Sequence, residues 1–149
     1  MVYWFTGQPA HGKTTLAKKL YKYHKDVFEN KIKGISIDGD DLRQIFNNKD
    51  YSESGRRRNI KLAQDLALFL HEKGYDVYVS LVTPFRDMRE DFKNKLNSEI
   101  KEFYIYCSKE RQREMYKVKD YEPPTENFVL IDTTEDSIEQ SLYKILQEI

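Results

Sequence analysis

Short apolar runs alternate along the chain with longer segments of helical periodicity, and this alternation constrains the fold more than any other feature. Five runs have the length and composition of buried strands, at residues 2–5, 35–37, 76–82, 102–107 and 127–131. Helical patterns follow them, at residues 13–29, 52–73, 85–97, 109–118 and 135–148. Strands that alternate with helices form a parallel sheet covered by its crossover helices. The sequence therefore predicts an α/β fold with a mostly parallel five-stranded sheet and helices on both faces.

Length and composition indicate one domain that spans residues 1–149. The chain has no internal repeat or linker, and its 149 residues suit a single compact unit. One cysteine, Cys107, excludes an internal disulfide and a zinc site with several thiolates. It fits a small buried hydrophobe in a reducing compartment, and we expect a cytoplasmic protein. No run reaches the roughly 20 apolar residues that a membrane helix needs, so no membrane partner is expected.

The charge of the chain is balanced overall but uneven along its length. It has 25 basic and 25 acidic side chains, which argues against a protein that coats nucleic acid. Residues 1–75 hold 14 basic and 9 acidic side chains, whereas residues 76–149 hold 11 and 16. The basic half could form a local anion site, or its charges could be scattered over a solvated surface.

Three loops that follow predicted strands hold most of the chemically distinctive residues, at 7–14, 38–43 and 83–86. In a parallel α/β sheet, ligands bind at the carboxyl ends of the strands. The three loops are therefore expected to meet at one edge of the sheet.

The first of these loops matches the phosphate-binding pattern G-x-x-x-x-G-K-[ST] without a mismatch. Its glycines let the backbone approach phosphate oxygens, and the following helix contributes the positive end of its dipole. Lys13 is suited to the β- and γ-phosphates of ATP, and the Thr14 hydroxyl is suited to Mg²⁺. His11 is expected to face solvent without a catalytic role. The residues assigned to this nucleotide site are Gly7, Gln8, Pro9, Ala10, His11, Gly12, Lys13, Thr14 and Thr15.

Three carboxylates follow the second predicted strand, at Asp38, Asp40 and Asp41. Next to a nucleotide site, one carboxylate can deprotonate an acceptor hydroxyl and another can hold the metal. The alternative is that the cluster only caps the next helix. We assign Asp40 to catalysis, with Asp40 and Thr14 as metal ligands, and interpret Asp41 as a cap. For Asp38, both interpretations stay open.

Four blocks of sequence resemble the adenylylsulfate (APS) kinases, small P-loop kinases that use Mg-ATP to phosphorylate the 3′-hydroxyl of adenosine 5′-phosphosulfate. Besides the phosphate loop, residues 38–43 (DGDDLR) are similar to the family's Asp-Gly-Asp-Asn-x-Arg. Residues 51–60 (YSESGRRRNI) resemble its Phe-Ser-x-x-Asp-Arg-x-Glu-Asn-Ile, and residues 81–86 (LVTPFR) its Ile-Ser-Pro-Tyr-Arg. The resemblance implies a P-loop NTPase of the nucleotide kinase type.

The resemblance also implies roles for matching residues. Asp40 would be the catalytic or metal-associated acid, and Tyr51 would stack on the acceptor adenine. Arg56 and Asn59 would bind the phosphosulfate and ribose together with Arg43, since guanidinium groups suit such oxygens. The acceptor-binding residues that we assign are Asp38, Arg43, Tyr51, Arg56, Asn59, Thr83, Pro84 and Phe85, and Arg111 is assigned to the nucleotide site. Two small-molecule nucleotide substrates are implied, and a homodimer is left open.

The chain departs from the family between residues 111 and 124, where a Phe-Thr-Gly lid stretch is missing. In the family that Phe helps to sandwich the acceptor adenine, so Tyr51 is left without its opposite face. Lys117, Lys119 or Arg113 could still supply charge to the triphosphate. Two alternatives to an APS kinase therefore stay open. One is a P-loop kinase for another hydroxyl, such as a nucleic-acid 5′-end, a nucleoside or a sugar, and the other is a nucleotide-binding protein without turnover.

Overall fold

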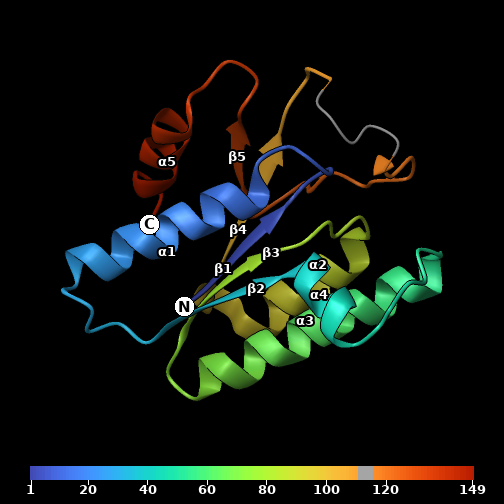
Figure 1. Cartoon of the computed structure of the whole chain (residues 1–149), viewed down its shortest axis with the longest axis horizontal. Coiled ribbons are helices and arrows are strands. Elements are labelled where there is room, and N and C mark those ends of the chain that lie inside the picture. The colour runs from blue at the N-terminus through green and yellow to red at the C-terminus, as the bar shows by residue number, and fades with distance from the viewer. Residues whose placement is uncertain (111–115) are drawn as a thin grey trace.

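The computed structural model describes residues 1–110 and 116–149 and contains a five-stranded sheet. Its strands are β1 (Val2–Thr6), β2 (Gly34–Asp38), β3 (Asp76–Ser80), β4 (Ile100–Tyr106) and β5 (Val129–Asp132). They are arranged in the order β2-β3-β1-β4-β5, and each neighbouring pair is parallel. The predicted fold class is confirmed, and the five described strands are parallel throughout (Figure 1).

Four of the five predicted helices are present with small changes in their bounds. They are α1 (Lys13–Val27), α3 (Glu53–Glu72), α4 (Arg86–Leu96) and α5 (Ile138–Leu146). A short helix α2 (Gly39–Ile45) follows β2 directly, and one 3₁₀ turn, η1 (Asn97–Glu99), precedes β4. The helix expected near residues 109–118 falls mostly on residues 111–115, which lie outside the described residues.

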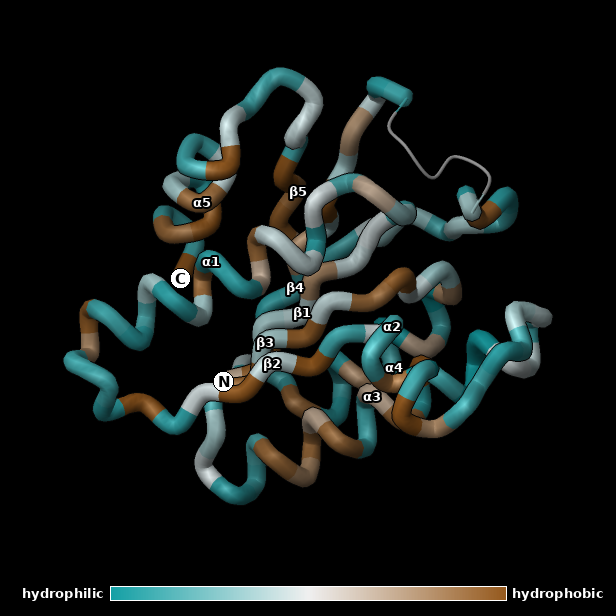
Figure 2. Tube along the Cα trace, in the orientation of Figure 1, coloured by the Kyte–Doolittle hydropathy of each residue, from teal (hydrophilic) through white to brown (hydrophobic). Residues whose placement is uncertain are grey.

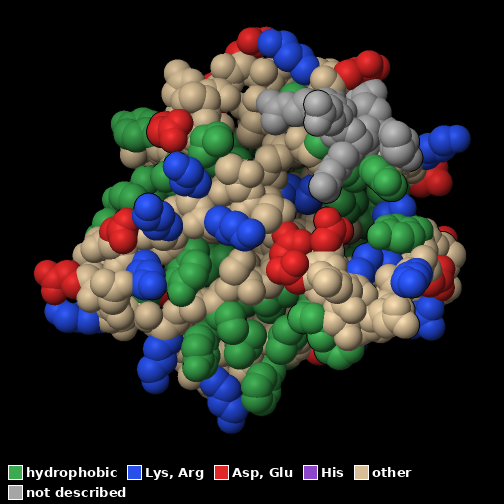
Figure 3. All heavy atoms as spheres, viewed as in Figure 1, with side chains coloured by type: hydrophobic (Ala, Val, Ile, Leu, Met, Phe, Trp, Pro, Cys, Tyr) green, Lys and Arg blue, Asp and Glu red, His purple; other side chains and the backbone are tan. Residues whose placement is uncertain are grey.

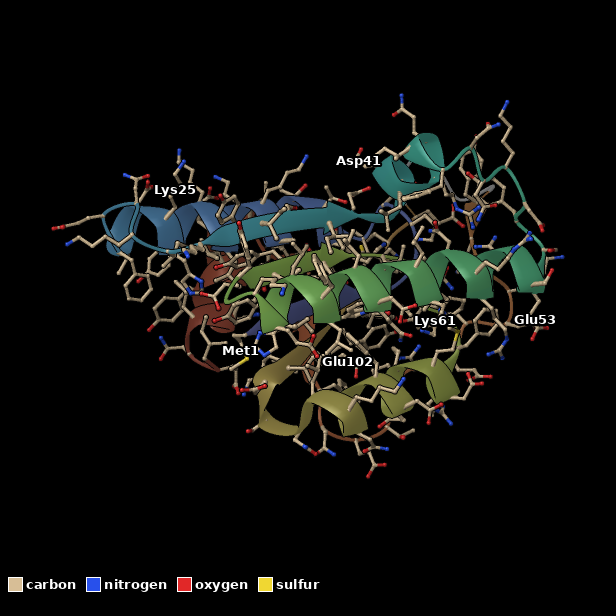
Figure 4. All side chains as sticks on the ribbon, turned by 90° about the horizontal axis from the view of Figure 1, so that it is seen from below. Met1, Lys25, Asp41, Glu53, Lys61 and Glu102 are labelled. Carbon is tan, nitrogen blue, oxygen red and sulfur yellow. The ribbon has the colours of Figure 1, made fainter. Side chains whose placement is uncertain are left out.

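The two faces of the sheet are covered by different pairs of helices because side chains of a strand alternate in direction. Val2 and Trp4 of β1 belong to the apolar core beneath α3 and α4. Tyr3 and Phe5 belong to the core beneath α1 and α5. Figure 4 shows α1 and α3 on opposite sides of the sheet, with Lys25 and Lys61 marking them. The hydrophobic strands therefore lie between two layers of helices (Figure 2).

None of the helices in the described part of the chain is long and apolar enough to cross a membrane.

The carboxyl ends of β1, β2 and β3 lie next to one another because these strands are adjacent in the sheet. The fold thereby brings the loop before α1 and the start of α2 to the same edge, as the sequence predicts.

Candidate active site

The phosphate loop, residues 7–14, is built on two glycines that no other residue could replace without strain. At Gly7 the backbone φ is 141°, and a Cβ atom there would lie 2.2 Å from the carbonyl oxygen of Ile105 in β4. At Gly12, the N-cap of α1, φ is 102°. Only glycine adopts such angles readily. The loop therefore packs closely against β4 and turns directly into the helix N-terminus, whose N–H groups favour anions.

Lys13 opens α1, and its side chain is buried at the base of the phosphate loop. Its Nζ atom donates a hydrogen bond of 2.6 Å to the backbone carbonyl of Gln8. The ammonium group thus lies within the loop that the motif assigns to phosphate binding.

Asp38 connects three elements at the edge of the sheet. Its Oδ2 accepts hydrogen bonds from the hydroxyl groups of Thr14 at 2.7 Å and of Ser80 at 2.8 Å. Its Oδ1 accepts one from the backbone N–H of Asp40 at 2.9 Å. Burial raises the pKa of the Asp38 carboxyl, but these hydrogen bonds outweigh burial and hold the pKa below its usual value. Asp38 is therefore ionised at neutral pH and fixes the phosphate loop to β2 and β3.

The capping role that we expected for Asp41 belongs instead to Asp38. Asp38 is the N-cap of α2, since its side chain accepts from the N–H two residues later. Asp41 is exposed, and Figure 4 shows it on the outer side of α2. The prediction for Asp41 was wrong because Asp38, the residue that ends β2, is the one whose carboxylate accepts from the N–H of Asp40. Asp40, the next acidic neighbour, lines the cleft described below.

The oxygen donors at this edge suit Mg²⁺. Magnesium is held in kinases by one or two carboxylates or hydroxyls together with waters and substrate phosphates. Thr14 and Asp38 are hydrogen-bonded to each other, and Asp40 is two residues from Asp38. Among the described residues no group of three or more His, Cys, Asp or Glu side chains could hold a metal alone. The donor set fits an ion that nucleotide phosphates help to bind.

A large open cleft of about 1390 Å³ lies above the phosphate loop. Its walls come from the loop itself, α2 and the segment that follows it, the N-terminal half of α3, the end of β3 and residues 116–117. Figure 3 shows acidic and basic side chains side by side on the surface between α1 and α2. Of the residues that the sequence assigned, the cleft brings together Pro9, Ala10, Gly12, Lys13, Thr14, Thr15, Asp38, Asp40, Arg43, Tyr51, Arg56 and Asn59.

Two guanidinium groups flank the ring of Tyr51 within this cleft. The Cζ atom of Arg43 lies 4.1 Å from the ring centroid, and that of Arg56 lies 5.6 Å from it. Both arginines donate to backbone carbonyls, Arg43 to Asn48 and Asp50 and Arg56 to Tyr51. Burial, followed by the charge of Arg43, lowers the pKa of Arg56. Two like charges held this close make a site that attracts an anion.

Asn59 contributes an amide to the same cleft from the second turn of α3. Its side chain is buried, and its Nδ2 donates to the carbonyl of Gly39 at 3.4 Å. Its Oδ1 has no hydrogen-bond partner among the described residues. A buried amide oxygen without a partner is costly, so a donor from a bound molecule would satisfy it.

Several assigned residues do not line the cleft. Thr83 is fully buried, and its hydroxyl accepts from the indole N–H of Trp4 at 3.0 Å. Pro84 is buried, and the ring of Phe85 is covered by Arg57 at 4.2 Å. Arg111 lies outside the described residues. The turn at 83–85 therefore packs against the protein interior instead of facing the cleft.

Two residues of the phosphate loop have side chains that the motif does not explain. His11 is half-buried, and its Nδ1 lies 3.3 Å from the carbonyl oxygen of Ile105, so the expectation of a solvent-facing imidazole was wrong. The side chain of Gln8 bonds to the backbone of Val118. Both contacts join residues about 100 positions apart, and no local pattern could indicate them.

Sequence reasoning also missed cleft residues. Tyr116 and the segment 47–49 line the cleft, and neither was assigned to the site from the sequence. Lys117, one of three cations considered for the triphosphate, lines it as well.

A family model described as adenylylsulphate kinase matches residues 1–126. The chain belongs to the adenylylsulphate kinase family. It is therefore a kinase of the P-loop NTPase fold. The adenylyl-sulfate kinase of Staphylococcus carnosus is 27% identical, in an alignment that covers 99% of this chain and 82% of the relative. The cytidine diphosphoramidate kinase of Campylobacter jejuni is 29% identical, with 95% of this chain and 83% of the relative covered.

Solved structures show the same fold. The crystal structure of APE1195 has a TM-score of 0.84 at 24% identity, and the match covers 99% of this chain and 93% of that chain. The Mycobacterium tuberculosis APS kinase CysC in complex with AMPPNP and APS has a TM-score of 0.82 at 18% identity, with 98% and 95% covered.

The two relatives differ in how their lengths fit this chain. The alignment with the S. carnosus protein spans 167 positions, so at least 18 have no counterpart among the 149 residues here. The alignment with the C. jejuni protein spans 145 positions and fits within that length. Within the aligned regions, this chain is therefore shorter than the first relative and about as long as the second.

Proposed function

We propose that this kinase transfers the γ-phosphoryl group of ATP, bound with Mg²⁺, to the 3′-hydroxyl of adenosine 5′-phosphosulfate. The observation that carries this proposal is that one cleft is lined by the phosphate loop, by Asp40 and by the pair Arg43 and Arg56. A donor site, an acid–base group and an anion site are the parts that a nucleotide-phosphorylating enzyme needs.

The donor side follows from the phosphate loop. Its N–H groups and Lys13 hold the β- and γ-phosphates, where Lys13 offsets charge that builds up during transfer. The Thr14 hydroxyl and the carboxylates of Asp38 and Asp40 would hold Mg²⁺, which neutralises phosphate charge when bound. Because Asp38 is already held by hydrogen bonds, it keeps Thr14 in place.

The transfer step itself places Asp40 at the acceptor hydroxyl. The acceptor oxygen forms a bond to the γ-phosphorus as the bond from that phosphorus to the bridging oxygen breaks. ADP leaves with the electron pair of the broken bond, and the hydroxyl proton passes to the Asp40 carboxylate. Asp40 is suited to this role because it is exposed to the cleft.

The acceptor side is the group around Tyr51. Arg43 and Arg56 offer paired donors to the anionic part of a nucleotide, and the ring offers a face to its base. Asn59 adds a buried oxygen that can accept from a ribose hydroxyl. These groups recognise a nucleotide with a charged 5′-substituent.

A second candidate acceptor is cytidine diphosphoramidate, and the length of the chain favours it. The C. jejuni relative that is named for this substrate aligns within the length of this chain, whereas the S. carnosus relative named for APS does not. A nucleotide with a smaller base and a charged diphosphate group would still meet the guanidinium pair beside Tyr51.

An acceptor panel decides between these substrates. The purified protein is incubated with Mg²⁺ and γ-labelled ATP, and label transfer is measured with APS, cytidine diphosphoramidate, a nucleoside, a sugar and a 5′-hydroxyl oligonucleotide. Labelling of APS at a kcat/KM well above that of the other acceptors supports the proposal. Preference for cytidine diphosphoramidate reverses the order of the two candidates.

Two other outcomes would reject both candidates. Strong labelling of the oligonucleotide alone would make the protein a polynucleotide kinase. ATP binding without transfer to any acceptor would indicate a binding protein without turnover. The variant Asp40→Asn is the matched control, since its labelling should fall to background with every true acceptor.

A further inference from the structure

Gln8 lies in the phosphate loop, but its side chain forms hydrogen bonds with a segment that is distant in the sequence. Its Nε2 donates to the carbonyl of Val118 at 2.8 Å, and its Oε1 accepts from the N–H of Val118 at 2.9 Å. The two bonds satisfy both backbone groups of one residue, as a neighbouring strand would. Residues 110 positions apart are thereby held in a single register.

The backbone of Gln8 also takes part in a hydrogen bond. Its carbonyl accepts the 2.6 Å hydrogen bond from Nζ of Lys13. One residue therefore contacts the phosphate-loop lysine through its main chain and the residue after Lys117 through its side chain. Lys13 and Lys117 both line the cleft.

The rest of the segment is anchored further along the chain. The hydroxyl of Tyr121 lies 2.8 Å from that of Thr6, and its ring stacks on Tyr104 at 5.8 Å. The N–H of Glu122 donates to the carbonyl of Pro84. Within residues 116–120, the hydrogen bonds to other parts of the described chain are the two between Gln8 and Val118. The position of Lys117 is thus set locally by Gln8.

Lys117 carries a charge that suits the donor phosphates. Its side chain is exposed to the cleft and has no carboxylate partner among residues 1–110 and 116–149. A lysine is a flexible point charge, so its contribution depends on where its backbone is held.

We infer that Gln8 is a positioning residue, which holds Lys117 at the phosphate end of the cleft so that this second lysine contacts the triphosphate of ATP. The inference rests on the proposed use of ATP but not on the identity of the acceptor. In this arrangement the loop that binds the phosphates also places a cation contributed by a remote segment.

A double-mutant cycle on donor binding tests the inference. The affinity of the whole protein for Mg-AMPPNP is measured by calorimetry in wild type, Gln8→Met, Lys117→Ala and the double variant. Methionine keeps the length of the side chain but removes both hydrogen bonds. We expect each single variant to weaken binding by about tenfold, and the double variant to bind no more weakly than Lys117→Ala.

Multiplicative losses in the double variant would overturn the inference, because Gln8 would then act on the loop and not through Lys117. Unchanged affinity in Gln8→Met would overturn it as well. Tyr121→Phe serves as the matched control, since it removes a hydrogen bond from the same segment three residues beyond Val118 and should leave affinity within about twofold.

The cycle stays readable whatever the acceptor panel gives, because AMPPNP reports the donor site alone. If wild type binds AMPPNP and the losses in the double variant are multiplicative, only the role of Gln8 is refuted. Wild type that does not bind AMPPNP refutes the proposed function itself. Faster hydrogen exchange at the Val118 amide in Gln8→Met would support the loss of positioning independently of any nucleotide.

Discussion

The hydroxyl of Thr14 donates a hydrogen bond of 2.7 Å to the carboxylate of Asp38, which ties the first turn of α1 to the end of β2. Ser80 donates to the same oxygen from the end of β3. The carboxylate therefore joins the start of α1 to the ends of β2 and β3. Because Asp40 follows it by two residues, this connection also sets the distance from the phosphate loop to the acid assigned to catalysis.

Replacing Asp38 by alanine should destabilise the protein by about 2 kcal/mol. The variant loses the cap of α2 and leaves the hydroxyl groups of Thr14 and Ser80 without their acceptor. Urea unfolding at pH 7 measures the loss. Asp41→Ala, one residue from Asp40 but exposed and outside the cleft, is the control and should change stability by less than about 0.5 kcal/mol.

The same carboxylate should make stability depend on pH in the acidic range. Folding lowers the pKa of Asp38, so its contribution is complete above the unfolded value near 3.8 and is lost as the pH falls through the folded value. The unfolding free energy of Asp38→Asn should therefore fall less steeply below pH 4 than that of wild type. Equal slopes for the two proteins would contradict this reading of the hydrogen bonds.

Removal of the Lys13 ammonium or of the Asp40 carboxylate should nearly abolish turnover. Lys13→Ala removes charge at the transferred phosphoryl group, and Asp40→Ala removes the acceptor of the hydroxyl proton. Losses of about 10²-fold or more in kcat are expected for each. ADP release with the acceptor found by the panel measures this. Asp41→Ala should retain wild-type turnover, and a similar loss in that variant would indicate a general effect on α2.

Arg56→Ala should weaken acceptor binding selectively. Arg56 lies beside Tyr51 and Arg43, so its loss should raise the KM of an anionic acceptor by about tenfold while the KM of ATP stays unchanged. Arg58→Ala is a control from the same run of arginines, because Arg58 is paired with Asp50 at 2.8 Å at the exposed surface. Equal changes in both variants would point to long-range charge instead of contact.

The ion pair between Arg89 and Glu102 should be essential to stability. Both side chains are almost fully buried, their Nε and Oε1 atoms are 3.0 Å apart, and Lys93 contacts the same carboxylate at 2.8 Å. Figure 4 shows Glu102 between the sheet and α4. Glu102→Ala removes the carboxylate that pairs with the buried Arg89, whereas Lys93 keeps its contact with Glu90 at 2.9 Å. We expect a loss of about 3–5 kcal/mol in unfolding free energy.

Chemical denaturation of Glu102→Ala and Arg58→Ala under the same conditions tests this difference. The exposed pair of Arg58 with Asp50 should contribute no more than about 1 kcal/mol. A loss in Glu102→Ala as small as that in Arg58→Ala would show that water reaches the buried carboxylate.

Local chemistry made much of the phosphate loop predictable. Consecutive N–H groups must point at one anion, which requires the two glycines, Lys13 and Thr14 at a fixed spacing. That spacing can be recognised directly in the sequence. Strand and helix periods could likewise be recognised, since each reports which side of an element is buried. Asp40 was assigned because it follows the second strand, and Arg43 and Arg56 were assigned through the resemblance to the APS kinases. All three line the cleft.

Contacts between distant segments could not be predicted. The capping contact of Asp38 with the N–H of Asp40 is local, but its other oxygen binds the hydroxyl groups of Thr14 and Ser80, which come from two other elements. Thr83 was assigned to a substrate because it follows β3, yet it turns inward to the indole of Trp4. Either direction is compatible with its sequence, and packing of α4 and β1 selects one.

By itself, the sequence determined the parallel α/β fold, the phosphate loop and the edge of the sheet where ligands bind. These follow from local periodicity and backbone geometry, which neighbouring residues impose on one another. Only the tertiary structure decided that Gln8 holds the backbone of Val118 and that Asp38 joins Thr14 to Ser80. Such pairings arise because a buried polar group must find a partner wherever the fold brings one, at any distance along the chain.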